Sequence, residues 1–262
     1  MIVPAVDLGI VGRLEGVYEV NSLPQREIEH GKLLASMQTE KIWGWDTPAG
    51  RLRADRRAAL IIRGGHLAPG TQALEIGCGT GMFSERFAQT GARLVAVDIS
   101  GDLLRKAIAR KLPERVTFLE KRFEDCEVDG PFDAVIGSSI LHHLDINASF
   151  AKIYALLRPG GTMSFAEPNM LNPQVFLERR FRRWFPCVSP DETAFVRWRL
   201  AGVLSTAGFE RIEITPFDWL HPSTPESLID SVKRIGGWLE RIPIVRELAG
   251  SLWICARRPS NR

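Results

Sequence analysis

The chain has 262 residues, of which 45% are hydrophobic and 25% charged, with a formal net charge of +3. This length and hydrophobic content exclude a disordered chain and predict one large folded domain with appendages. The small positive charge is carried mainly by arginine and does not indicate a nucleic-acid-binding protein.

The cysteines and the first residues bear on the cellular compartment. Four cysteines are scattered without a C-x-x-C pair, so we expect neither a metal site nor a disulfide framework, and a reduced cytoplasm fits best. The N-terminus lacks a basic start and carries Asp7 in its apolar stretch, and no run of eighteen apolar residues occurs. We therefore expect a cytoplasmic protein without an integral membrane segment, while peripheral membrane contact stays open.

The first predicted elements are helices. Residues 1 to about 46 read as an appendage with a helix over 24–40. Thr47 has the residue type of a helix N-cap and Pro48 that of a first helical position, which predicts a helix through Ile62. We expect residues 1–62 to form an N-terminal helical lid and residues 63–262 to form the main domain.

Strands and helices alternate through the main domain. Such alternation predicts an α/β fold with a doubly wound, mostly parallel sheet and helices on both faces. Strands are expected at 73–76, 94–98, 116–119, 134–137, 162–166, 209–216 and 251–256, and helices at 80–89, 101–110, 148–157 and 191–207.

Two insertions exceed this core, at residues 168–190 and 218–250. The first contains a basic and aromatic run, 176–185, for which an ordinary amphipathic helix is favoured over an acidic-acceptor site or a membrane contact. Insertions of this kind usually supply the acceptor pocket. The second insertion carries apolar residues at the spacing of one helical face, namely Leu228, Val232, Ile235, Trp238 and Leu239.

The most informative motif is the run 73–81, which joins an apolar strand to a turn with glycines at 77, 79 and 81. Glycines allow a tight turn and a close approach of the backbone to a ligand, and the following helix directs free N–H groups at that ligand. The spacing is G-x-G-x-G. A dinucleotide fingerprint would need a glycine at position 82, where the chain has Met82, so an NAD-dependent dehydrogenase is disfavoured but stays an alternative.

A second strand ends in Asp98, where an acid accepts hydrogen bonds from ribose hydroxyls in doubly wound folds. With Glu75 inside the first strand, this arrangement resembles the class I S-adenosylmethionine (SAM) dependent methyltransferases, whose hallmark is E/D-x-G-x-G-x-G followed by such an acid. The segments 132–144 and 156–162 match later motifs of that family, and the resemblance covers roughly residues 60 to 215.

The resemblance implies a Rossmann-like seven-stranded sheet whose last strand is antiparallel, and SAM as the cofactor. Glu75 would orient the glycine turn and the methionine end of SAM, and Asp98 would bind its ribose. Arg122 stands where the family commonly has an acid, so the resemblance leaves the adenine contact to Glu124 or to the backbone of Phe123. The implied cofactor-binding residues are Glu75, Gly77, Cys78, Gly79, Gly81, Asp98, Ile99, Leu103, Phe123, Glu124 and Ser138.

Candidate catalytic residues follow the fourth and fifth strands. An imidazole there could take a proton from an acceptor hydroxyl or amine, and we favour His142 for this role. His143 is expected in the substrate pocket or bonded to the framework, and Glu167 is expected as a second base or an acceptor-orienting group. Structural roles for all three remain open, because methyl transfer is an in-line displacement that depends mainly on alignment and desolvation.

The segment before the main domain carries Trp43, Trp45 and Arg53, which we expect to bind substrate. Aromatic walls exclude water, and an arginine can clamp an anionic group. The alternative is that the tryptophans fill a hydrophobic seam and the arginines are solvated.

These observations predict a SAM-dependent methyltransferase acting on an oxygen or nitrogen of a small-molecule acceptor. A methyltransferase of a lipid-linked or polysaccharide acceptor at a membrane surface and a non-catalytic SAM-binding subunit are the alternatives. Methylation of RNA or protein is less expected, because the chain has no separate basic recognition module. The acceptor and the oligomeric state are not predicted.

Overall fold

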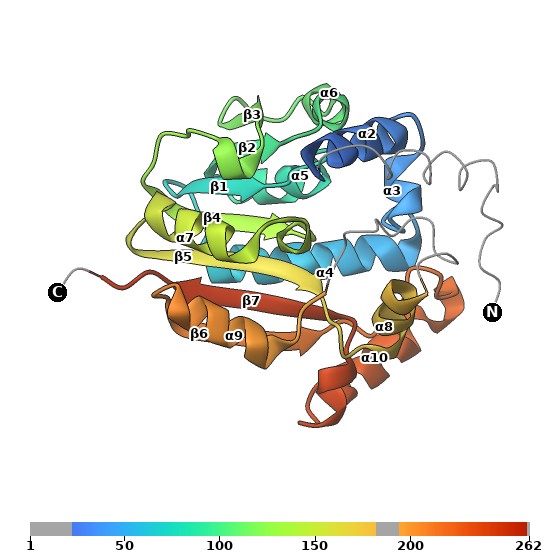
Figure 1. The fold of residues 1–262 in the computed structure, drawn as a ribbon. Coiled ribbons are helices and arrows are strands. Elements are labelled where there is room, and N and C mark those ends of the chain that lie inside the picture. The colour runs from blue at the N-terminus through green and yellow to red at the C-terminus, as the bar shows by residue number, and fades with distance from the viewer. Residues whose placement is uncertain (1–22, 182–193, 261–262) are drawn as a thin grey trace.

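The computed structural model describes residues 23–181 and 194–260 (Figure 1). Residues 1–22 of the expected appendage lie outside this description. The second half of the basic and aromatic run, from residue 182, and the first residues of the helix expected at 191–207 also lie outside it.

The described residues form a seven-stranded sheet in the order β3-β2-β1-β4-β5-β7-β6. Strands β1 to β5 are parallel, and β7 runs antiparallel to both β5 and β6. The predicted fold class is confirmed, including the antiparallel last strand. The strands are β1 (Gln72–Ile76), β2 (Arg93–Asp98), β3 (Val116–Glu120), β4 (Phe132–Ser138), β5 (Leu157–Pro168), β6 (Glu210–Phe217) and β7 (Ser251–Arg257).

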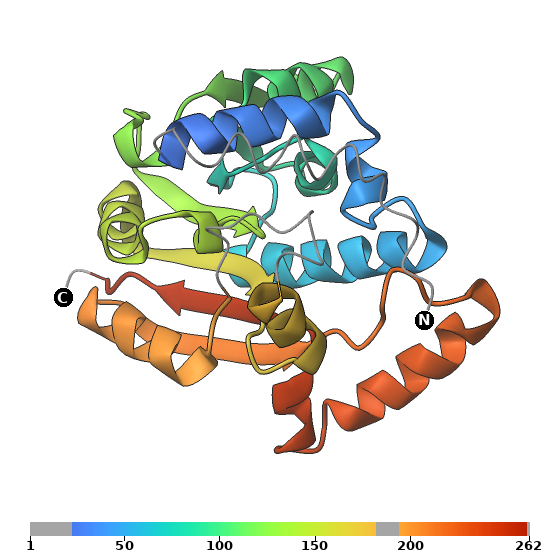
Figure 2. The same cartoon turned by 45° about the vertical axis from the view of Figure 1, so that its right-hand side comes forward.

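Helices cover both faces of this sheet and extend past its edge (Figures 1 and 2). They are α2 (Leu23–Ala35), α3 (Thr39–Ile42), α4 (Pro48–Gly65), α5 (Met82–Ala88), α6 (Gly101–Ala109), α7 (Ile146–Leu156), α8 (Pro173–Arg180), α9 (Arg197–Thr206) and α10 (Ile229–Leu239). Short 3₁₀ turns lie at Phe123–Asp125, Leu141–His143, Glu226–Leu228 and Val245–Leu248.

The core has two layers because side chains alternate between the faces of each strand. Leu74 and Val135 join the cluster that includes residues of α7 and α9, whereas Ala73 and Ile136 join the cluster that includes residues of α4 and α5. The short apolar strands of the sequence are therefore buried on both sides. Burial on both faces is the usual state of the strands in a parallel sheet.

Helix α4 begins as predicted. Thr47 is the N-cap, its hydroxyl accepts a hydrogen bond from Gly50 N at 2.9 Å, and Pro48 is the first helical residue. The helix ends at His66, which adopts φ = 50°. Since Ala58 and Ile61 pack in the core, α4 belongs to a layer covering the sheet. Of the helices described within the predicted lid, α2 and α3 lie beyond that layer.

The chain changes direction at β1. From β1 it proceeds outward to β2 and β3, then returns to β4 on the other side of β1. Such a switch point leaves a crevice beyond the carboxyl ends of the two central strands, which is where ligands bind in open α/β sheets. The topology thus places the glycine turn, Asp98 and the end of β4 around one crevice.

Candidate active site

A cavity of about 340 Å³ occupies this crevice. Its floor is the glycine turn after β1 and the ends of β2 and β4, and its sides include the 3₁₀ turns Phe123–Asp125 and Leu141–His143. Helix α2 and the tryptophans Trp43 and Trp45 line it from the N-terminal segment. Glycines, three acids, apolar side chains and histidines therefore face a single space.

The glycine turn requires glycine at its first position. Gly77 adopts φ = 66°, which disfavours other residues, and a Cβ there would lie 2.4 Å from Cγ1 of Ile140. Gly77 N donates to Val97 O at 2.8 Å, so the turn is tied to β2. The turn consequently presents bare backbone to the cavity, as the predicted cofactor cradle requires.

Asp98 lies at the tip of β2 and lines the cavity. Its Oδ2 accepts from Gly79 N at 2.7 Å and its Oδ1 from Ser100 N at 2.9 Å. Burial raises the pKa of this carboxyl, and the charge of Glu27 adds to the rise, while both backbone hydrogen bonds oppose it. A carboxylate has further lone pairs, so these two bonds position the group and leave acceptor capacity toward the cavity.

Glu75 lies behind the glycine turn and does not line the cavity. It is almost fully buried, and its Oε2 has no hydrogen-bond partner. Burial, aided by the charge of Asp98, raises the pKa of Glu75 to about 8. The structure therefore places Glu75 where it can hold the turn, with no direct path to a ligand.

Of the remaining cofactor candidates, Gly81 lies off the cavity wall and the others lie on it. Gly81 faces helix α6, since a Cβ on it would lie 2.9 Å from Cβ of Ala107. The structure brings the other candidates together on the cavity wall: Gly77, Cys78, Gly79, Ile99, Leu103, Phe123, Glu124 and Ser138.

His142 and Glu167 form a close buried pair. Nδ1 of His142 lies 2.6 Å from Oε2 of Glu167, and Oε1 of Glu167 accepts from Ile140 N and Leu141 N, both at 2.9 Å. His142 lines the cavity, whereas Glu167 is fully buried behind it. Burial alone would raise the pKa of Glu167, but His142 and the backbone donors hold this pKa below its ordinary value. Glu167 is therefore an ionised acceptor that orients the imidazole.

This geometry fixes the roles of the two imidazole nitrogens. The carboxylate accepts the Nδ1–H proton, so Nε2 is the acceptor atom of the neutral ring. Sequence reasoning placed both residues at the same sheet edge but did not pair them. Glu167 does not line the cavity itself and is connected to it by its contact with His142.

His143 contacts the N-terminal helix across the cavity. Its Nδ1 lies 3.3 Å from Oε1 of Glu27 on α2, and both residues line the cavity together with His30. Nothing in the sequence marked Glu27 or His30, because α2 carries no motif. A hint was Gly31, whose missing side chain allows α2 to pack against Ser100 at the start of α6.

Trp43 and Trp45 also lie on the cavity wall, as expected. A Cβ on Gly79 would lie 3.4 Å from Cη2 of Trp43, so the indole rests on the glycine turn. Trp45 packs edge-on against Phe83 with ring centroids 5.7 Å apart. We call α2, α3 and these two tryptophans the roof of the cavity.

Arg110 ties the roof to the glycine turn. Its guanidinium donates to Thr80 O at 2.6 Å, to Glu85 at 2.8 Å and to Glu40 of α3 at 2.7 Å. Thr80 Oγ1 donates to the same oxygen of Glu40 at 2.8 Å. Despite its partial burial, these contacts hold the pKa of Glu40 below its ordinary value. One side chain thus joins three elements around the cofactor turn.

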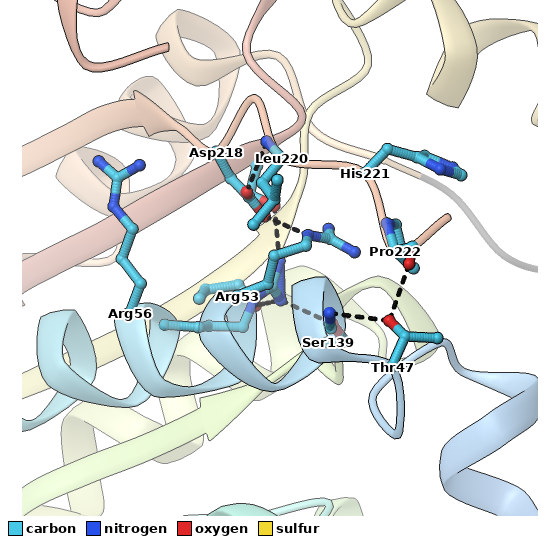
Figure 3. A network of polar contacts seen from close by, with 12 residues as sticks. Thr47, Arg53, Arg56, Ser139, Asp218, Leu220, His221 and Pro222 are labelled. Atoms are coloured by element: carbon cyan, nitrogen blue, oxygen red, sulfur yellow. Dashed lines mark hydrogen bonds and ion pairs between the residues drawn. The ribbon is translucent and has the colours of Figure 1, made fainter. Parts of the chain in front are cut away.

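Arg53 lies outside the cavity wall. Its Nε donates to Oδ2 of buried Asp218 at 2.8 Å, and Thr47 Oγ1 donates to Pro222 O at 2.7 Å, as Figure 3 shows. The expected insertion 218–250 is therefore bound to α4 through its first residues. None of its residues lines this cavity.

Arg57 lies at the centre of the same network, and its role was not predicted. It is buried and donates to Ser139 Oγ at 2.8 Å, Ala166 O at 3.1 Å and Ser251 Oγ at 2.7 Å. Burial, together with the charge of Arg53, lowers its pKa to about 10. Ser139 and Ala166 precede Ile140 and Glu167, so Arg57 supports the backbone around the dyad from below.

The described residues contain no group of three His, Cys, Asp or Glu side chains arranged to hold a metal ion. None of the helices that the structure describes is both long and apolar enough to cross a membrane.

Comparison with known proteins agrees with the fold and the site. Residues 73–161, from β1 into β5, match the family described as methyltransferase domain. The seven-stranded sheet of this order, the glycine turn and the acid after β2 are features that this chain shares with the class I SAM-dependent methyltransferases, and the matched segment is a methyltransferase domain. The predicted family is confirmed.

Among individual proteins, the chain is similar to a ubiquinone biosynthesis O-methyltransferase of Xanthomonas campestris pv. campestris. The two are 33% identical over 133 residues, which cover 48% of this chain and 56% of that protein. The chain thus spans about half the length of the curated relatives it matches.

Solved structures extend the likeness of fold over most of the chain. The N-methyltransferase NodS of Bradyrhizobium japonicum, in complex with S-adenosylhomocysteine (SAH), has a TM-score of 0.62 at 17% identity and covers 89% of this chain and 99% of that one. A Haemonchus contortus phosphoethanolamine N-methyltransferase in complex with SAM has a TM-score of 0.62 at 18% identity, covering 92% and 61%. At these identities the likeness concerns the fold.

Proposed function

We propose that the chain binds SAM in the cavity and transfers its methyl group to an oxygen or nitrogen of a small-molecule acceptor, with a hydroxyl as the best-fitting group. The observation that carries this preference is the buried pair of His142 and Glu167 on the cavity wall. A hydroxyl must lose its proton as it is methylated, whereas a neutral amine attacks through a lone pair it already has.

The residues around the glycine turn fit SAM. The backbone of Gly77 to Gly79 would follow the methionine portion, Asp98 would accept from the ribose hydroxyls, and Ile99 and Leu103 would flank the adenine ring. When bound, SAM supplies a methyl group on a positively charged sulfur. Phe123 and Glu124 lie on the wall where the adenine edge would be read.

In the proposed reaction, Nε2 of His142 takes the proton of the acceptor hydroxyl. The acceptor oxygen forms a bond to the methyl carbon as the carbon–sulfur bond breaks, and the electron pair of that bond stays on sulfur. Glu167 stabilises the imidazolium without taking its proton. Trp43 and Trp45 keep water from the reacting groups, which strengthens this electrostatic support.

Calorimetry with SAM and with SAH tests the cofactor assignment. Wild-type protein is expected to bind both. Asp98→Ala is expected to weaken binding by about 10- to 100-fold through loss of charge-assisted hydrogen bonds. Absence of SAM binding, or full binding by Asp98→Ala, would overturn the assignment, and displacement of SAM by NAD would favour a dehydrogenase.

The acceptor class is tested by the formation of SAH, detected by mass spectrometry, with matched panels of phenols, alcohols and primary amines. Turnover of hydroxyl acceptors supports the proposal, and turnover of amines alone contradicts the preference for oxygen. SAM binding without turnover of any panel member would instead indicate a SAM-binding subunit.

A further inference from the structure

Helix α10, the 3₁₀ turn before it and the segment after it expose a row of large apolar side chains. The exposed fractions are 51% for Leu228, 58% for Ile235, 60% for Trp238, 84% for Ile244 and 42% for Leu248. The opposite face of α10 packs on the body, since Ile229 is buried and Gly236 lies against Trp219. Figure 2 shows α10 as an arm beyond the sheet and away from the roof.

Basic side chains lie among these apolar ones. At about 100° per residue, Arg234 lies beside Trp238 on the outward face of α10, and Arg241 follows just after the helix ends at Leu239. Both are exposed, and neither forms an ion pair with another described residue.

Two of the four acids of the same segment are engaged elsewhere, and Glu226 is exposed before α10, where the exposed Lys233 on α10 offsets its charge. Glu240 pairs with Arg56, and Glu247 pairs with Arg197 at 2.7 Å. Asp230 is exposed at the edge of the outward face. The apolar row therefore carries an excess of positive charge.

This surface continues to the cavity through α8, which lies beside α10 in Figures 1 and 2. Asn172, the N-cap of α8, donates to Leu248 O at 2.7 Å. Phe176 and Leu177 of α8 are exposed, and Arg179 on the same helix lines the cavity. An apolar and basic surface thus runs from α10 to the cavity wall.

We propose that Leu228, Arg234, Ile235, Trp238, Arg241 and Ile244, which we call the α10 surface, dock on a membrane that contains anionic lipids. Tryptophan is stable at the level of lipid headgroups, exposed aliphatic side chains gain free energy in the acyl boundary, and arginines extend to phosphates. Resting on the proposed function, this makes the acceptor an amphiphile that reaches the cavity along α8.

A second copy of the chain fits this surface less well. Face-to-face pairing of two copies would bring Arg234 and Arg241 of one protomer toward the same residues of its partner. Like charges at close range oppose association, whereas anionic phosphates neutralise them. Charge complementarity therefore favours the lipid surface.

Co-sedimentation of the full chain with vesicles tests the proposal. Vesicles of phosphatidylcholine alone are compared with vesicles that also contain phosphatidylglycerol, at low and high salt. The wild-type protein is expected to bind the anionic vesicles, and added salt is expected to weaken this binding. Trp238→Ala and the pair Arg234→Glu with Arg241→Glu are each expected to reduce vesicle affinity at least about tenfold.

Trp198→Ala provides the matched control, because Trp198 is 55% exposed and belongs to α9, outside the α10 surface. It is expected to leave vesicle binding unchanged, and all variants are expected to keep the SAM affinity of the wild type. Measuring SAM affinity beside vesicle binding separates failure of docking from failure of the proposed function. Absence of binding to anionic vesicles, or equal loss in Trp198→Ala, would overturn the proposal. So would a dimer in solution that Trp238→Ala dissociates.

Discussion

At the scale of single residues, two buried acids lie behind the cavity wall in different surroundings. Glu167 accepts from two backbone N–H groups and from His142, while Glu75 has an oxygen without any partner. The same residue type is therefore held ionised in one place and protonated near neutral pH in the other. This contrast separates a group that orients a base from one that supports a turn.

Replacing Glu167 tests the dyad. Glu167→Gln keeps the size of the side chain but removes the charge that stabilises the imidazolium, so we expect kcat to fall about 100-fold with SAM affinity nearly unchanged. His142→Gln is expected to match this loss, and the double variant to be no worse than either single one. Steady-state rates of SAH formation measure the effect, and circular dichroism confirms folding. Full activity in both single variants would refute the assignment.

Glu75→Gln tests the raised pKa of about 8. Between its ordinary pKa of 4.5 and about 8, the folded state binds more protons than the unfolded state at this position, so the contribution of Glu75 to stability falls as pH rises. Glutamine does not titrate, so the variant lacks this pH-dependent loss of stability. We expect its Tm to exceed that of the wild type by at least ~2–4 °C at pH 8, with a smaller difference at pH 5. Equal differences at both pH values would contradict the assignment.

At the scale of elements, the roof rests on polar contacts as much as on packing. Arg110 reaches α3, α5 and the glycine turn, and Lys106 on the same helix donates to Met37 O at 2.9 Å and Thr39 Oγ1 at 3.0 Å. Helix α6 is thus the anchor of the roof. A cofactor in the cavity would be enclosed by elements that α6 connects.

Arg110→Met is therefore expected to loosen the roof. We expect SAM affinity to fall about tenfold, which corresponds to ~1.4 kcal/mol, mainly through faster dissociation. The control is Arg105→Met on the same helix, because Arg105 is exposed and pairs only with Asp102 one turn away. Stopped-flow displacement of SAM measures both rates, and equal dissociation rates in the two variants would show that the contacts of Arg110 do not hold the roof.

The sequence predicted elements better than it predicted contacts between them. Apolar runs bounded by glycine and acid marked the strands, and Thr47 with Pro48 marked the start of α4, because these signals are local. The pairing of His142 with Glu167 and the destination of Arg57 depend on which strands become neighbours. That depends on the whole sheet, so no spacing along the chain revealed them.

At the scale of the whole molecule, the cofactor side is general and the acceptor side is particular to this chain. The family match spans residues 73–161, whereas the roof, α8 and α10 lie outside it. Site residues on the sheet could be assigned from motifs for this reason. Glu27 and His30 could not, because the roof has no shared pattern.

Ligand binding is expected to stabilise the folded chain as a unit. A ligand that binds only the folded state adds RT ln(1 + [L]/Kd), about 2.7 kcal/mol at a hundredfold excess over Kd, so SAH should raise Tm by roughly 5–10 °C. Differential scanning fluorimetry measures the shift. Asp98→Ala is expected to reduce it strongly and Trp198→Ala to preserve it. A shift of equal size in Asp98→Ala would place the ligand elsewhere.

The contact between Trp43 and Gly79 bears on the order of events in turnover. Because the indole lies over the turn that would hold the spent cofactor, SAH could leave only after α3 lifts. Loop and lid movements of this kind occur in microseconds to milliseconds and often limit kcat. The first methyl transfer after mixing would then outpace the later ones, so the speed of the enzyme would be set by the exit of its product.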